Sequence, residues 1–147
     1  MPEPRVGVGL FVFRPNGTFI IGKRKGALGS GSLGLPGGHL EFGESFTICA
    51  ARELLEETGI KVTEESIHFL TAGNNVFVKE ERHYVTIAMG VLLEGEMVEV
   101  EPELCIWAKE DMEKGEGEKR LFQPMGEFVR QNGGGFNPFE VLKAKMR

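Results

Sequence analysis

The stretch GHLEFGESFTICAARELLEETGI, residues 38–60, decides the fold of this chain. It predicts a loop and then a helix from about Ser45 to Thr58, because Ser45 is a favourable N-cap and Gly59 a favourable helix stop. The helix carries Glu53, Glu56 and Glu57 within five residues. Like charges three or four residues apart destabilise a helix by about 0.2–0.5 kcal/mol per pair. Some other interaction must therefore offset this repulsion.

A helical wheel gathers the three glutamates on one side, since each residue advances by about 100°. It predicts a buried apolar face opposite them, made of Ile48, Ala51, Leu54 and Leu55. A solvated acidic face is the simplest interpretation of such a charge run. Two features count against it: the acids lie towards the C-terminal end, where the helix dipole disfavours negative charge, and no lysine lies one turn away. Bound Mg²⁺ would relieve the repulsion, because it prefers carboxylate oxygens and keeps waters that a phosphate can displace.

The loop before the helix supplies the second half of this pattern. Gly37, Gly38 and Gly43 lie in LPGGHLEFGE, where backbone without a side chain can approach a ligand closely. A glycine-rich loop alone is weak evidence. Followed by a helix with clustered carboxylates, it indicates a metal–phosphate site.

Length and composition bound the class of protein. The 147 residues suit one domain, residues 1–147, and the shares of hydrophobic (41%) and charged (27%) residues are ordinary for a globular protein. A net charge of −5 disfavours long nucleic acid and anionic membranes as partners. No apolar run has membrane-spanning length, and the N-terminus lacks the form of a signal peptide. Cys49 and Cys105 show no metal-ligand spacing, so we expect a reduced, cytoplasmic protein.

Outside residues 38–60 the sequence predicts more strands than helices. The expected strands are residues 6–13, 19–25, 66–78, 83–93 and 104–108, and the first two form a hairpin around the Asn-Gly turn at 16–17. Residues 26–38 read as irregular. A second helix is expected at 120–131, followed by a tail that Phe136 and Phe139 can dock. This order of elements predicts α/β/α layers around a mixed sheet.

Residues 38–60 resemble the complete signature of the Nudix hydrolases. The pattern Gly-x5-Glu-x7-Arg-Glu-apolar-x-Glu-Glu-x-Gly-apolar is filled at every fixed position, from Gly38 to Ile60. The resemblance implies the α/β/α sandwich and metal-dependent hydrolysis of a nucleoside diphosphate linked to another group. It implies Mg²⁺, with Mn²⁺ as a substitute, and it identifies residues 38–60 as the Nudix box.

The resemblance also implies roles for single residues. Glu53, Glu56 and Glu57 would bind metal, and Glu53 would orient or deprotonate the attacking water. Arg52 would be the structural partner of a box carboxylate, and Glu44 either a metal neighbour or a loop anchor. The backbone carbonyl of Gly37 or Gly38 would complete the metal shell.

Further motifs are similar to a eukaryotic subgroup of MutT-like nucleoside triphosphate diphosphatases. They are GKRKGALGSGSLGLPGGHLEFGESF, NNVF, HYVTI, EPELC and GFNPF. The resemblance implies that substrate contacts are made by Arg24, Leu35, Gly37, Gly38, Thr86 and the late helix. That helix has Gln123 where the subgroup has tryptophan, and only Trp107 follows EPELC where the subgroup has two. Both departures bear on which base is bound.

Several other residues have two interpretations. Arg24 either binds phosphate or is a solvated strand end, and Leu35 can be core rather than base contact. His39, His83 and Tyr84 are more often structural than catalytic in such positions. Trp107 is either core or a stacking platform. A carboxylate outside the box can assist catalysis, and the candidates are Glu80, Glu81, Glu101 and Glu103.

These observations predict a Mg²⁺-dependent hydrolase that converts nucleoside triphosphates, including oxidised purine nucleotides such as 8-oxo-dGTP, to monophosphate and pyrophosphate. One alternative is a dinucleotide or nucleotide-sugar pyrophosphatase acting on NADH or ADP-ribose. Another is a catalytically silent Nudix-fold binding module, although silent members commonly lose box glutamates. A homodimer is also expected, from the subgroup resemblance, the apolar strand at 84–93 and the aromatic tail.

Overall fold

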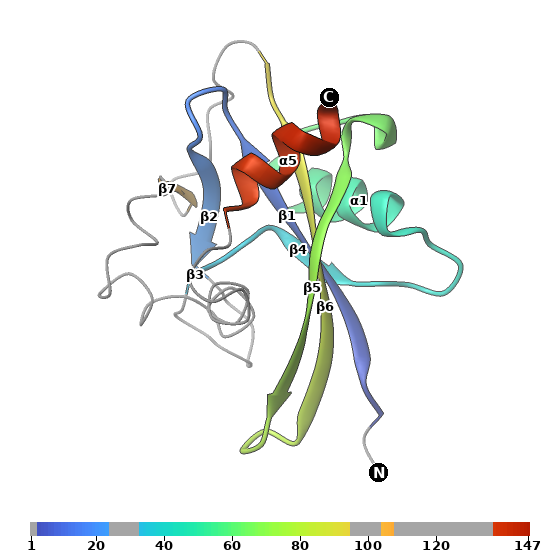
Figure 1. The fold of residues 1–147 in the computed structure, drawn as a ribbon. Coiled ribbons are helices and arrows are strands. Elements are labelled where there is room, and N and C mark those ends of the chain that lie inside the picture. Colours follow the sequence, from blue (N-terminus) through green and yellow to red (C-terminus); the bar gives the residue numbers. More distant parts are fainter. Residues whose placement is uncertain (1–2, 24–32, 95–103, 108–136) are drawn as a thin grey trace.

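The structure is a computed structural model and describes residues 3–23, 33–94, 104–107 and 137–147. Figure 1 shows a sheet with described helices on both of its faces. The strands are β1 (Arg5–Phe13), β2 (Phe19–Lys23), β3 (Leu33–Gly34), β4 (Gly37–His39), β5 (His68–Phe77), β6 (Arg82–Leu92) and β7 (Leu104–Trp107). The helices are α1 (Phe46–Thr58), the short 3₁₀ helix η1 (Glu64–Ser66) and α5 (Pro138–Met146). The prediction of an α/β fold with a mixed sheet is confirmed.

The sheet is mixed because β1 pairs parallel with β6, while its other pairings are antiparallel. The strand order is β3-β2-β1-β6-β5, with β4 added beside β1 and β7 beside β2. Along β1, Gly9 aligns with Gly37 of β4 on one side and with Ala88 of β6 on the other. The strand before the carboxylate helix is thus built into the sheet directly beside β1.

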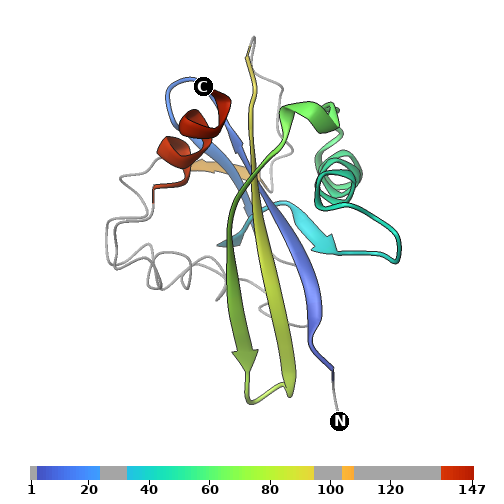
Figure 2. The ribbon, with the colours of Figure 1, turned by 45° about the vertical axis from the view of Figure 1, so that its right-hand side comes forward.

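Successive side chains of β1 point to opposite faces of the sheet, and this divides the core into two layers. Val8, Leu10 and Val12 pack with the buried residues of α1, whereas Phe11 and Phe13 pack towards Leu142 of α5. Figure 2 shows α1 and α5 on opposite sides of the sheet. The sheet is therefore buried on both faces where the helices cover it.

Helix α1 begins and ends as its sequence predicts. Ser45 Oγ accepts from the backbone N of Ile48 at 3.1 Å, which satisfies one of the free donors of the first turn. Gly59 adopts φ 76°, and its N–H donates to the carbonyl of Leu55. Both boundaries of the predicted helix are confirmed to within one residue.

The predicted buried face of α1 is confirmed for Leu54 but is wrong for Ile48 and Leu55. Its buried residues are Cys49, Ala50 and Leu54, whereas Ile48 and Leu55 are 43% and 48% exposed. The buried face is thus centred near Glu53, whose side chain is only 15% exposed. The physical reason is that β4 presents glycines to the helix, so that the Glu53 carboxylate can lie against the sheet beside the buried Cys49, Ala50 and Leu54.

Other sequence predictions also need correction. The segment 26–38 contains strand residues at 33–34 and from 37 onwards, because glycine without a side chain can still pair in a sheet. The tail includes helix α5, which Asn137 caps by accepting from the N of Glu140. The predicted strand at 66–78 begins only at His68, since η1 ends at Ser66. The predicted helix at 120–131 lies outside the described residues.

The apolar strand at 84–93 is not a free surface. As β6 it lies between β1 and β5, and residues 87–91 are buried. No helix in the described part of the chain is long and apolar enough to cross a membrane.

Candidate active site

Strand β4 and helix α1 form the centre of the candidate site. The backbone N of Gly37 donates to Glu57 Oε2 at 3.0 Å. A Cβ on Gly38 would lie 2.3 Å from Glu53 Oε1, so this carboxylate rests directly against the bare Cα. A Cβ on Gly37 would lie 2.1 Å from the carbonyl oxygen of Val8 on β1. Both glycines are therefore required by close approaches, one to backbone and one to a carboxylate.

Arg52 ties together the carboxylates of the loop and the helix. Its Nε and Nη2 donate to the two oxygens of Glu44 at 2.7 and 2.8 Å, which is a bidentate pair. Its Nη1 donates to Glu53 at 2.8 Å and to Glu56 at 3.5 Å. Its Nη2 also donates to the backbone carbonyl of His39 at 3.2 Å. Arg52 therefore offsets part of the repulsion among the helix glutamates.

Negative charge remains in excess around this guanidinium. Glu41 Oε1 lies 3.8 Å from Arg52 Nη2, so Arg52 contacts four carboxylates, those of Glu41, Glu44, Glu53 and Glu56. Glu57 lies beside Gly37 and adds a further carboxylate to the described part of the site. The site therefore has the charge of a cation-binding site.

Glu44 anchors the loop. It accepts from Arg52 and, through Oε1, from the backbone N of Glu41 at 2.8 Å. These hydrogen bonds, that from Arg52 first, lower the pKa of Glu44 from 4.5 to about 2. The same Glu44 pair raises the pKa of Arg52 above its ordinary value. Burial raises the pKa of the neighbouring Cys49 thiol to about 11, so it remains protonated at neutral pH.

The lowered pKa of Glu44 predicts a pH dependence of stability. Below about pH 4.5 Glu44 is protonated in the unfolded chain. In the folded chain its pKa is about 2, so it becomes protonated only near that pH. The contribution is therefore fully present above pH 4.5 and is lost as pH falls towards 2. We expect the urea concentration at the unfolding midpoint to fall less steeply with decreasing pH in Glu44→Gln than in wild type across this range. The exposed Glu65→Gln serves as the control, and a Glu44→Gln slope equal to that of wild type would contradict the prediction.

A family model described as the NUDIX domain matches residues 3–130. This chain belongs to the Nudix family. Residues 38–60, which the sequence predicts to be the Nudix box, comprise most of β4, the loop anchored by Glu44, and α1 (Figure 1).

Individual relatives share parts of the chain or its fold. The RNA pyrophosphohydrolase of Caulobacter vibrioides is 35% identical over 63 residues, which are 43% of this chain and 37% of that protein. The match thus spans little more than a third of the curated relative's length. A MutT Nudix hydrolase from Burkholderia pseudomallei is 26% identical, with a TM-score of 0.62 over 96% of this chain and 97% of that chain.

A third neighbour shows the likeness of fold alone. It is a bifunctional NMN adenylyltransferase/ADP ribose pyrophosphatase from Francisella tularensis, solved with AMP and a manganese ion. It is 19% identical, with a TM-score of 0.60 over 100% of this chain and 43% of that chain.

The Nudix box offers oxygen ligands but holds them apart. Among the described residues, no three His, Cys, Asp or Glu side chains are grouped as a metal site requires. Glu53 faces Arg52 and Gly38, Glu57 faces Gly37, and Glu56 is exposed. The available donors are carboxylate and carbonyl oxygens, which suit Mg²⁺ and Mn²⁺. The chemistry of the donor set therefore fits a hard divalent cation.

Of the predicted substrate residues, Leu35 and Thr86 lie on the face of the sheet opposite α1, whereas Gly37 and Gly38 lie in β4 beside α1. Leu35 packs against the cluster around Phe11, on the α5 side, and is half-buried. Thr86 lies in β6 beside Gly7 of β1. Arg24 and Gln123 lie outside the described residues. Their proposed contacts with phosphate and base stay predictions.

The other candidate residues lie in different parts of the fold. His39 Nε2 and Tyr84 Oη are 2.9 Å apart, and their rings stack at 5.4 Å, whereas His83 bonds Asn74. Glu80 and Glu81 lie in the turn of the β5–β6 hairpin, whose tip extends away from α1 in Figure 1. Glu101 and Glu103 lie outside the described residues, and of Trp107 only the backbone, paired with Phe19, is described.

The sequence interpretation missed Asn75. It is fully buried, and it donates to Thr86. The signal available in the sequence was its place in the NNVF motif, two residues before a buried phenylalanine on a strand whose buried positions alternate.

Proposed function

We propose that this chain is a divalent-metal-dependent hydrolase that cleaves nucleoside triphosphates to monophosphate and pyrophosphate. The observation that carries the proposal is the packing of two box carboxylates, Glu53 and Glu57, against the bare backbone of Gly38 and Gly37. Carboxylates beside glycine backbone offer oxygen ligands to a hard divalent cation where a phosphate chain can approach the backbone closely. A catalytically silent module has no need of this arrangement.

In this proposal Glu53, Glu56 and Glu57 hold the cation, together with a backbone carbonyl of Gly38. A bound Mg²⁺ or Mn²⁺ supplies an activated water and neutralises phosphate charge. Glu53 orients that water, because its carboxylate lies against Gly38 of β4 and accepts from Arg52. Arg52 and Glu44 hold the loop that carries these groups. The manganese bound in the Francisella tularensis enzyme supports a cation of this type.

The preference for a nucleoside triphosphate rests on the subgroup resemblance and on the half-buried Leu35 and Thr86, which offer a face for a base. The similar proteins act on different pyrophosphate bonds: those of RNA for the Caulobacter vibrioides relative, and of ADP-ribose for the Francisella tularensis enzyme. The net charge of −5 disfavours long RNA as the substrate here.

A nucleotide panel with Mg²⁺ tests the proposal. We expect release of pyrophosphate, not phosphate, from GTP, ITP, dGTP and 8-oxo-dGTP, and no release after the metal is chelated with EDTA. Activity confined to ADP-ribose or NADH would replace the proposal with a dinucleotide or nucleotide-sugar pyrophosphatase. Binding of nucleotides without turnover at any metal concentration would indicate a silent module.

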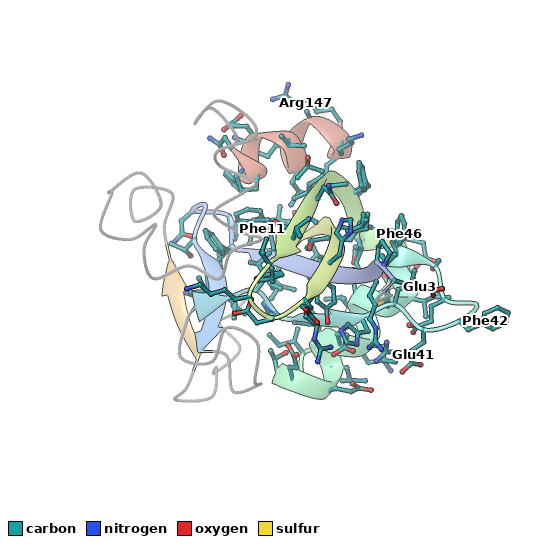
Figure 3. All side chains as sticks on the ribbon, turned by 90° about the horizontal axis from the view of Figure 1, so that it is seen from below. Glu3, Phe11, Glu41, Phe42, Phe46 and Arg147 are labelled. Carbon is teal, nitrogen blue, oxygen red and sulfur yellow. The ribbon has the colours of Figure 1, made fainter. Side chains whose placement is uncertain are left out.

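We also propose that the protein is a homodimer. Phe42, Phe46, Ile48 and Leu55 are exposed on α1 and the loop before it, and Figure 3 shows Phe42 extending away from the body. Light scattering at micromolar concentration is expected to give twice the chain mass of 16.2 kDa. A monomer mass under these conditions would refute the dimer.

A further inference from the structure

Asn75 is a polar residue in a position that folding alone does not explain. Its side chain is 0% exposed on β5, and its Nδ2 donates to Thr86 Oγ1 at 3.1 Å. Its Oδ1 has no hydrogen-bond partner among the described residues. An unpaired buried acceptor destabilises the folded state, so an apolar residue of similar size would suit stability better. Among the described residues, the amide's hydrogen-bond partner is Thr86.

Gly7, Gly9 and Thr86 form an area of the sheet with small side chains, which we call the sheet floor. A Cβ on Gly7 would lie 3.8 Å from Tyr84, and one on Gly9 would lie 3.4 Å from Leu35. Tyr84 and Leu35 therefore stand beside glycines on the same face. The three residues of the sheet floor and the neighbouring Tyr84 and Leu35 are all half-buried, so a ligand can reach the sheet floor.

The sheet floor is one strand away from the Nudix box. Gly7 of β1 aligns with His39 of β4 on one side and with Thr86 of β6 on the other. Neighbouring strands lie about 4.8 Å apart, which puts Thr86 about 10 Å from the strand that carries the box glycines. Because Leu35 and Thr86 lie on the face opposite α1, a nucleotide whose phosphates lie at the box would reach the sheet floor past the glycines of β4.

The hydrogen bond from Asn75 determines what Thr86 offers to that base. A threonine hydroxyl has one hydrogen to donate and two lone pairs. Because Asn75 Nδ2 occupies one lone pair, the hydroxyl hydrogen points elsewhere, and no acceptor for it is found in the described residues. The pair thus presents a hydrogen-bond donor on the sheet floor.

We propose that Asn75 is a positioning residue that orients the Thr86 hydroxyl to donate to a carbonyl oxygen of the substrate base. This inference rests on the proposed function. It assigns the preferred substrates to bases that carry such a carbonyl, of which the 6-oxopurines are the purine examples. A site built to hydrogen-bond a substrate group rejects analogues that lack the group, because its own polar atoms are then left unpaired.

The test compares two triphosphates that differ at this group, ITP and purine riboside triphosphate, which has hydrogen in place of the 6-oxo group. We expect wild type to favour ITP in kcat/KM, and both Asn75→Leu and Thr86→Val to lower that preference about tenfold, equivalent to about 1.4 kcal/mol. The double variant should lose no more than Thr86→Val alone, because Asn75 acts through Thr86. The thermal midpoint of Asn75→Leu should be at least that of wild type.

Asn74→Leu is the matched control. It makes the same chemical change one residue away, at an exposed side chain that bonds His83, and the ITP preference should persist. An unchanged preference in Asn75→Leu, or additive losses in the double variant, would overturn the inference while leaving the proposed function intact. Failure of wild type to release pyrophosphate from either triphosphate would instead overturn the proposed function, and this inference with it.

Discussion

Replacing Glu57 with glutamine should lower kcat by at least about 100-fold while the protein stays folded. The oxygen of the glutamine amide can still accept the hydrogen bond that the Gly37 N–H makes to Glu57 at 3.0 Å, so the geometry is kept. The negative charge proposed to hold the cation is removed. Folding should survive, because Glu57 is exposed and removing its charge weakens the repulsion within α1.

Two measurements distinguish a lost cation site from general damage. Mg²⁺ should raise the thermal midpoint of wild type, since a ligand that binds only the folded state stabilises it, and should do so less in Glu57→Gln. Glu65→Gln removes the same charge at an exposed position of η1 and should match wild type in both respects. Near-normal turnover of Glu57→Gln at saturating Mg²⁺ would contradict the assignment of Glu57 as a ligand.

The adjacent substitutions Gly37→Ala and Gly38→Ala should impair different properties: the first should lower stability and the second activity. A Cβ at Gly37 would meet the carbonyl oxygen of Val8 at 2.1 Å. Because backbone cannot move aside cheaply, β4 must separate from β1, and we expect a loss of about 3 kcal/mol or more in the free energy of unfolding. At Gly38 the obstacle is the end of the Glu53 side chain, which can rotate away. Gly38→Ala should therefore fold nearly as well as wild type but lose activity at least about tenfold, because Glu53 is displaced.

Urea unfolding and steady-state kinetics on both variants give the contrast directly. Equal losses of stability in the two variants would show that the obstacle at Gly38 is rigid. Full activity in Gly38→Ala would show that the position of Glu53 against β4 is not needed for catalysis. Each variant thus serves as the control for the other, since both make the same chemical change on one short strand.

Local sequence patterns predicted those features that depend on near neighbours in the chain. Ser45 and Gly59 bound α1 because capping is satisfied within one turn of the helix. The order of strands and helices predicted the mixed sheet for a similar reason, since strand and helix periodicities are local. The short β4 was missed because its glycines carry no periodic signal. Helix α5 was missed because the glycines before it suggested only a flexible tail.

The sequence by itself determined the Nudix box, the closeness of Glu53, Glu56 and Glu57, and the glycines that precede them. Only the tertiary structure decided which face of α1 turns inward. Helical periodicity sets the angles between side chains on one helix but not which of them meets a neighbouring strand. Here β4 lacks side chains at Gly37 and Gly38, so the Glu53 carboxylate lies against the sheet while Ile48 and Leu55 are exposed. The pairing of Asn75 with Thr86 likewise depends on the register of β5 against β6, which long-range hydrogen bonding selects.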